Sequence, residues 1–150
     1  MAVTIEIRNL DAFRNAVKAL GEAMRTATGK AVNECLRVAA LQERTLLDLG
    51  RHPLGTRTGS PPGSPPWLVT GHLHDSVKVR RARETAPGVW YGEMGPSAIY
   101  GRIQELGGNT GRGHRTHLPP RPHLYPAWRL VRPTMRDTFI KAWRDAQRWF

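Results

Sequence analysis

Residues 10–50 read LDAFRNAVKALGEAMRTATGKAVNECLRVAALQERTLLDLG, and this stretch decides the fold. Apolar side chains recur at every third or fourth position along it, which is the spacing of one face of an α-helix. Gly50 supplies a C-terminal stop. Because Thr28-Gly29 can interrupt the run, the pattern predicts either one long helix or a pair of helices over about 10–49.

Two segments rich in proline and glycine stand out from the rest of the chain. Residues 51–66 read RHPLGTRTGSPPGSPP, with five prolines and three glycines, and residues 109–122 read NTGRGHRTHLPPRP, with no apolar periodicity. Proline lacks a backbone N–H, and glycine loses much entropy when it is ordered, so neither segment suits a helix or a central strand. Both are predicted to be extended loops.

The remaining segments give shorter signals. Alternation predicts a short strand at 4–7 and a β-hairpin over 77–94. Helical spacing predicts a short helix over 97–106 and a long C-terminal helix after residue 124, which Pro133 should kink or split. The fold class expected is therefore α+β, with long N-terminal helices, a small and mostly antiparallel sheet, and a long C-terminal helix.

The chain has 150 residues, which predicts one domain spanning 1–150, and a net charge of +11. The charge is uneven, since residues 1–50 contribute +1 and residues 101–150 contribute +7. Nineteen of the 23 basic residues are arginine, the side chain best suited to bidentate contacts with phosphate or carboxylate. DNA or an acidic protein surface is a plausible partner, and an arginine-rich genome explains the composition equally well.

Catalytic and metal chemistry find little support in the sequence. Cys35 is the only cysteine, which excludes an internal disulfide and a cysteine-based zinc site, and its spacing suits a small core residue. His72 and His74 form one pair and His114 and His117 another, but zinc usually needs three or four ligands in fixed geometry. The sequence has no GxSxG, HExxH or P-loop motif. We therefore expect no enzyme activity, no cofactor and no metal.

Targeting signals are not apparent either. No window approaches ~18 consecutive apolar residues, so no transmembrane helix and no membrane partner are expected. The N-terminal sequence MAVTIEIRNLD lacks the basic and apolar regions of a secretory signal. A soluble intracellular product is expected.

Three segments resemble motifs of one phage morphogenesis family. Residues 59–77, GSPPGSPPWLVTGHLHDSV, resemble the pattern SPPG-x-PP followed by TG-x-L-x-x-S-[IV]. Residues 98–107, AIYGRIQELG, resemble YA-x-x-x-E-[FLY]-G, and residues 119–127, PPRPHLYPA, resemble PPRPFL-x-PA. The chain departs from these patterns at His123, where an aromatic residue is usual, and at Gly101. The segments are similar to those of the neck and tail-completion proteins of long-tailed bacteriophages, to which the lambda tail-completion protein Z is related.

The resemblance implies a structural virion protein that joins the head connector to the tail. Its expected partners are copies of itself in a ring, with six or twelve subunits, together with other neck, connector and tail-tube proteins. The expected location is the neck of the virion, after assembly in the cytoplasm of the bacterial host. The segments 51–66 and 109–122 would be arms that become ordered on adjacent subunits.

The resemblance and the residues together give two sets of candidate site residues. Arg121, held on a stiff Pro-Arg-Pro backbone, is expected to anchor its loop by pairing with Glu105. The residues expected at subunit interfaces or loop anchors are Trp67, Thr70, Leu73, Tyr100, Glu105, Arg121, Pro122 and Trp128. The residues expected to contact packaged DNA non-specifically in a channel are Arg80, Arg81, Arg83, Arg112 and Arg115.

Two other classes of function are weighed against this one. A basic protein that binds nucleic acid non-specifically would use the same arginines, and its affinity would fall steeply with salt. A small metal-dependent nuclease would need His114 and His117, and it has weaker support in the sequence.

Overall fold

The computed structural model describes residues 9–55 and 59–148. The strand expected at 4–7 lies outside this part of the chain. The described elements are α1 (Leu10–Leu47), α2 (His72–Asp75), β1 (Val77–Ala86), β2 (Val89–Pro96), α3 (Gly101–Leu106), β3 (Gly108–Thr110), a 3-10 turn η1 (Arg112–His114), β4 (Thr116–Leu118) and α4 (Leu124–Gln147). The expected α+β class is confirmed.

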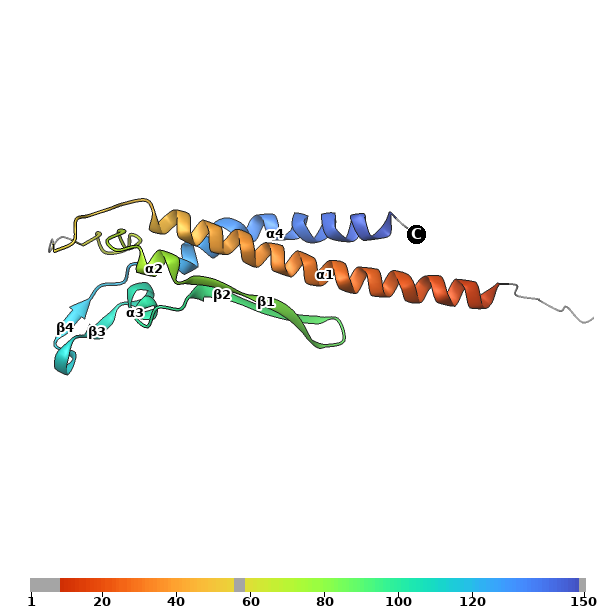
Figure 1. The fold of residues 1–150 in the computed structure, drawn as a ribbon, viewed down its shortest axis with the longest axis horizontal. Helices are drawn as coiled ribbons and strands as arrows, with labels where there is room; N and C mark the ends of the chain where they lie inside the picture. The colour runs from red at the N-terminus through yellow and green to blue at the C-terminus, as the bar shows by residue number, and fades with distance from the viewer. Residues whose placement is uncertain (1–8, 56–58, 149–150) are drawn as a thin grey trace, which may run out of the picture.

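The fold is built along α1. Figure 1 shows α4 running back along one side of this helix and the β1–β2 hairpin lying along another side. The β1–β2 pair is antiparallel, as the sequence predicts, and β3 and β4 form a second two-stranded antiparallel sheet at one end. The accessible surface of the chain is 11366 Å², well above the roughly 7,700 Å² expected for a compact monomer of this mass.

The N-terminal helical region is one helix rather than a pair. Gly29 does not break it, because the missing side chain makes room for the indole ring of Trp90 on β2. A Cβ at Gly29 would lie 2.5 Å from the Trp90 ring. The hairpin has a glycine of its own at this contact. An added Cβ at Gly92 would lie 2.5 Å from Leu36 of α1. Glycines on both partners therefore let the hairpin approach α1 closely.

The Asn33 side chain of α1 hydrogen-bonds to the β1–β2 hairpin where the register of the hairpin is irregular. The register of β1 and β2 shifts between Arg80 and Arg83. Such a bulge leaves a backbone group without its ladder partner. The Ala82 N–H there donates to Asn33 Oδ1 at 2.8 Å, and the Asn33 amide donates back to the Gly29 carbonyl at 2.9 Å.

The contact between α1 and α4 is made by small side chains. Most of the buried residues on the two helices are small: they are Ala27, Gly29, Ala31, Cys35, Ala39, Ala40, Glu43 and Leu47 on α1, and Ala127 and Val131 on α4. Burial raises the pKa of the Cys35 thiol above its ordinary value, which agrees with a core residue. Of the two outcomes expected at Pro133, a kink or a split, the split is wrong, since α4 is one helix from Leu124 to Gln147 with Pro133 inside it and exposed.

The proline- and glycine-rich segments contain one more expectation that needs correction. The segment 109–122 is not an irregular loop, because it contains most of the β3–β4 hairpin. The start of the segment 51–66 pairs with residue 68 of the same chain. The Leu68 N–H donates to the Gly50 carbonyl at 2.7 Å, and the His52 N–H donates to the Leu68 carbonyl at 3.2 Å. The two segments, in their described parts, thus find partners within the same chain.

Candidate assembly site

The segments that carry the sequence motifs meet around α3. The Gly63 N–H donates to the Pro120 carbonyl at 2.8 Å, which joins the first proline-rich segment to the second. The Arg121 N–H donates to the Gln104 carbonyl at 2.7 Å, which joins the second segment to α3. Segments that are about 60 residues apart in the sequence are therefore fixed to one another at this end of the molecule.

Arg121 anchors its loop, but the expected partner is wrong. Its Nε donates to the carbonyl of the buried Ser60 at 2.9 Å, and no ion pair joins it to Glu105. Gly59 makes this possible, since a Cβ there would lie 2.8 Å from the guanidinium. The Arg121 side chain thus secures the SPPG segment.

Glu105 instead caps α4. Its carboxylate accepts the backbone N–H groups of His123, Leu124 and Tyr125 at 2.7 to 2.9 Å. The first N–H groups of a helix lack partners within the helix, and its N-terminus carries partial positive charge. A carboxylate supplied by α3 satisfies both needs, so Glu105 is directed at the N-terminus of α4 rather than at Arg121.

A buried polar pair lies behind this cap. His123 Nδ1 is 2.8 Å from Glu43 Oε1, and both side chains are fully buried. His123 Nε2 lies 3.8 Å from Glu105 Oε2. The pair joins the C-terminal part of α1 to the start of α4. The sequence analysis missed Glu43, because a glutamate on a helix ordinarily faces solvent and nothing links it to a histidine 80 residues later.

Two of the remaining interface candidates make contacts within the chain. Leu73 packs against the buried cluster of Ala40, Leu47 and Val77. Tyr100 shares a 2.8 Å hydrogen bond between its hydroxyl and His72 Nδ1, and burial raises the pKa of its phenol. Both side chains are partly buried, and their role at a subunit interface stays a prediction.

The motif region also presents exposed groups. Trp67 lies on Gly50, where a Cβ would be 2.4 Å from its indole, and the indole remains partly exposed. Thr70 is exposed, and its hydroxyl accepts the His72 N–H at a long 3.4 Å. Pro122 is half-buried.

On α4, an aromatic group faces outward. Trp128 stacks on Tyr125 with ring centroids 6.1 Å apart, and the Arg132 guanidinium lies 5.2 Å from the Trp128 ring. Tyr125 and Trp128 are both exposed. Trp128 is therefore an interface candidate that remains open to a partner.

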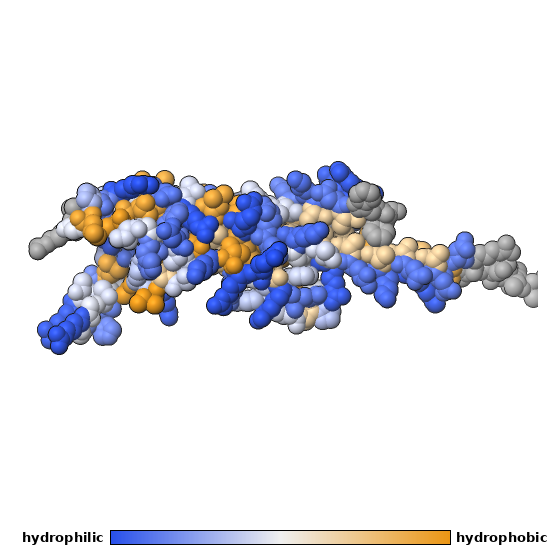
Figure 2. Space-filling model, viewed as in Figure 1, coloured by the Kyte–Doolittle hydropathy of each residue, from blue (hydrophilic) through white to orange (hydrophobic). Residues whose placement is uncertain are grey.

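The arginines expected in a DNA channel are exposed but lie on two different hairpins. Figure 2 shows hydrophilic residues gathered over the β3–β4 end and along the β1–β2 hairpin. Arg80 also pairs with Glu93, with 3.3 Å between Nη1 and Oε2. The candidates on β1 are Arg80, Arg81 and Arg83, and those near η1 are Arg112 and Arg115.

The histidines of the β3–β4 hairpin have partners of their own. His117 Nδ1 lies 3.1 Å from Asn109 Oδ1, and His114 Nδ1 lies 3.4 Å from the Asn109 carbonyl oxygen. Within residues 9–55 and 59–148, no three His, Cys, Asp or Glu side chains gather as a metal site would require. Over the same residues, no helix is long and apolar enough to span a bilayer.

No family model, curated protein or solved structure matches this chain.

Proposed function

We propose that the chain is a structural subunit of the neck of a long-tailed bacteriophage, where it forms or completes the junction between the head connector and the tail. The observation that carries the proposal is the convergence of the motif segments. Residues 59–66, 98–107 and 119–127 resemble one family in order and spacing, and they are hydrogen-bonded or packed together around α3. A set of motifs that forms one structural unit is stronger support than three separate resemblances.

The shape of the molecule agrees with a role in assembly. The chain is elongated, its core is built largely from alanine, and large apolar side chains stay exposed on α1, α4 and the hairpin. Monomeric proteins rarely expose extended apolar surface. We propose a ring of identical subunits, six or twelve in number, that contacts neck, connector and tail-tube proteins, because closed symmetric rings satisfy such surfaces repeatedly.

A phage that carries a stop codon in this gene tests the proposal. We expect infected cells to accumulate DNA-filled heads and complete tails that remain separate, because only the joining step needs this subunit. Electron microscopy of the lysate, with plasmid-borne wild-type gene as the rescue control, measures the outcome. Normal numbers of joined, infectious particles without the protein would refute the neck assignment.

Non-specific binding to nucleic acid is the second candidate function, and the exposed arginines on both hairpins favour it. Under that hypothesis the purified protein binds random duplex DNA, and log affinity falls linearly with log salt, with a slope set by the number of phosphates contacted. Under the neck hypothesis, the stop-codon phage fails to join heads and tails whether or not the purified protein binds DNA. Steep salt-dependent DNA binding by the wild type, together with normal joining in the stop-codon phage, would favour the second candidate.

A further inference from the structure

The N-terminal end of α1 extends past the end of α4, as Figure 1 shows. The face of α1 that packs on α4 is marked by Ala27, Ala31 and Cys35, all buried. The same face continues toward the N-terminus at helical spacing, but there Leu10 is 41% exposed, Phe13 66% and Val17 52%. Residues 10–18, here called the overhang, therefore carry the helix-packing stripe, and no helix among the described residues covers it.

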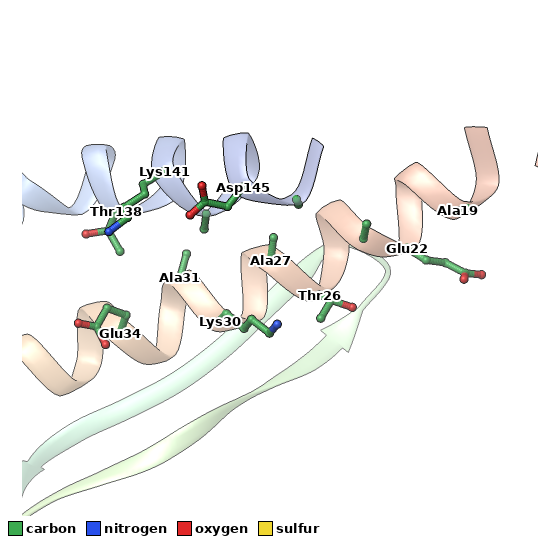
Figure 3. Close-up of a pocket in the computed structure, with 13 residues that line it drawn as sticks. Ala19, Glu22, Thr26, Ala27, Lys30, Ala31, Glu34, Thr138, Lys141 and Asp145 are labelled. Carbon is green, nitrogen blue, oxygen red and sulfur yellow. The ribbon is translucent and has the colours of Figure 1, made fainter. Parts of the chain in front are cut away.

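Beside the overhang lies a groove between α1 and α4. It has a volume of about 960 Å³, and its floor is made by alanines from both helices. Figure 3 shows Ala27 and Ala31 pointing toward α4. Figure 2 shows a band of light orange, the colour of alanine, over this part of the molecule. The alanines are Ala19, Ala23, Ala27, Ala31, Ala142 and Ala146.

Small side chains make this groove suitable for a helix. Alanine lining lets a helix with large side chains approach until those side chains fill the space that the lining leaves empty. The overhang is complementary in shape to this alanine-lined groove, because its large side chains Leu10, Phe13 and Val17 protrude from the helix. Alanine also flanks them, at Ala12 and Ala16, so that the apolar face of the overhang is broad.

Charge permits a second copy to dock at this groove. The chain has a net charge of +11, so two copies repel each other over most of their surfaces. The rim of the groove is closer to neutral, because its five charged residues sum to −1 and two of its acids are paired with arginines of their own helices, Glu34 with Arg37 and Asp145 with Arg148. The three charged residues of the overhang sum to +1, and Asp11 pairs there with Arg14. The rim residues are Glu22, Lys30, Glu34, Lys141 and Asp145, and those of the overhang are Asp11, Arg14 and Lys18.

We propose that the overhang of one copy docks in the α1–α4 groove of the next copy. The contact joins two different patches of the same chain, and contacts of this heterologous kind generate rings when the rotation between neighbours closes. The proposal rests on the proposed neck function for its setting, because it identifies the self-contact that a ring of these subunits needs. Burial of Phe13 against the alanine floor supplies the apolar contact.

Two variants and their mixture test this docking. Phe13→Asp places a charge on the overhang, and Ala146→Arg blocks the groove while leaving the overhang intact. We expect the wild-type protein to form oligomers in light scattering, and each variant alone to fall to the mass of one chain, 16.8 kDa. An equimolar mixture should recover a two-chain species, because the intact overhang of one variant fits the intact groove of the other.

Leu41→Asp is the matched control, since Leu41 is 55% exposed, close to the exposure of Val17, and lies on α1 outside both the overhang and the lining of the groove. It should keep the wild-type mass, and circular dichroism should show wild-type helix content in all three variants. The docking is wrong if the wild-type chain is monomeric at every concentration, or if Phe13→Asp and Ala146→Arg oligomerise as the wild type does. The neck assignment is tested separately: if the wild-type gene rescues joining in the stop-codon phage and Phe13→Asp rescues it equally well, the docking fails while the neck assignment stands.

Discussion

Replacing His123 with phenylalanine should destabilise the fold by roughly 3–5 kcal/mol, the range for breaking a buried polar or ionic pair by removing one partner. Glu43 is fully buried, and His123 Nδ1, at 2.8 Å, is the hydrogen-bond partner that its Oε1 has in the structure. Phenylalanine fills a similar volume but cannot satisfy the carboxylate. Urea unfolding followed by circular dichroism measures the loss as a shift in midpoint at constant slope.

The double variant Glu43→Leu with His123→Phe separates the pair from the packing. Replacing both partners of a buried pair by apolar groups of similar shape is often close to neutral. We therefore expect the double variant to recover most of the stability that His123→Phe loses. His74→Phe is the matched single control, because His74 is only half-buried and its partners Asp48 and Asp75 are more exposed than it is. A His123→Phe protein as stable as wild type would show that the buried pair contributes nothing.

Replacing Gly107 with alanine should be comparably damaging. Gly107 has φ 69° and ψ −177°, a conformation that only glycine adopts readily, and strain there costs about 1–3 kcal/mol. An added Cβ would also lie 2.8 Å from the Pro120 nitrogen and 2.9 Å from the Leu118 carbonyl oxygen. Because these neighbours are backbone atoms, they cannot rotate away, and such overlap costs about 1–3 kcal/mol more. Thermal unfolding measures the combined effect.

Substitutions at two other glycines separate the conformational cost at Gly107 from the cost of steric overlap. Gly88, in the turn of the β1–β2 hairpin, has φ 76° with nothing near its Cβ position, so Gly88→Ala should show the conformational cost alone. Gly21 lies in α1 with open space around it, and Gly21→Ala should raise stability by about 0.5–1 kcal/mol through better helix propensity. Equal losses at Gly107 and Gly88 would mean that the contact with the backbone of Leu118 and Pro120 is unimportant.

The sequence predicted the elements whose periodicity runs over many residues. The helix from residue 10, the β-hairpin near 77–94 and the terminal helix after 124 each have enough repeats for one face to be recognised. The β3–β4 hairpin was missed because its strands are three residues long and lie in a segment dominated by glycine and proline. Gly29 looked like a helix breaker, since the sequence does not show that Trp90 would lie on it.

The candidate site was predicted in part. The motif residues do lie together, but their partners could not be assigned from charge alone. Arg121 and Glu105 have opposite charges, yet the N-terminus of α4 offers Glu105 three N–H donors, and Ser60 offers Arg121 a carbonyl. The overhang was missed for a different reason. Periodicity tells which face of a helix is apolar, but only the position of the end of α4 shows that part of that face is uncovered.

We propose that this chain is a structural component of the virion neck. Electron cryomicroscopy of purified particles, with the copy number of the chain measured by quantitative mass spectrometry, tests it most directly. We expect a ring of identical copies at the head–tail junction, into which the α1–α4 body and its β1–β2 hairpin fit. Purified, infectious particles that contain no copy of the chain would contradict the account.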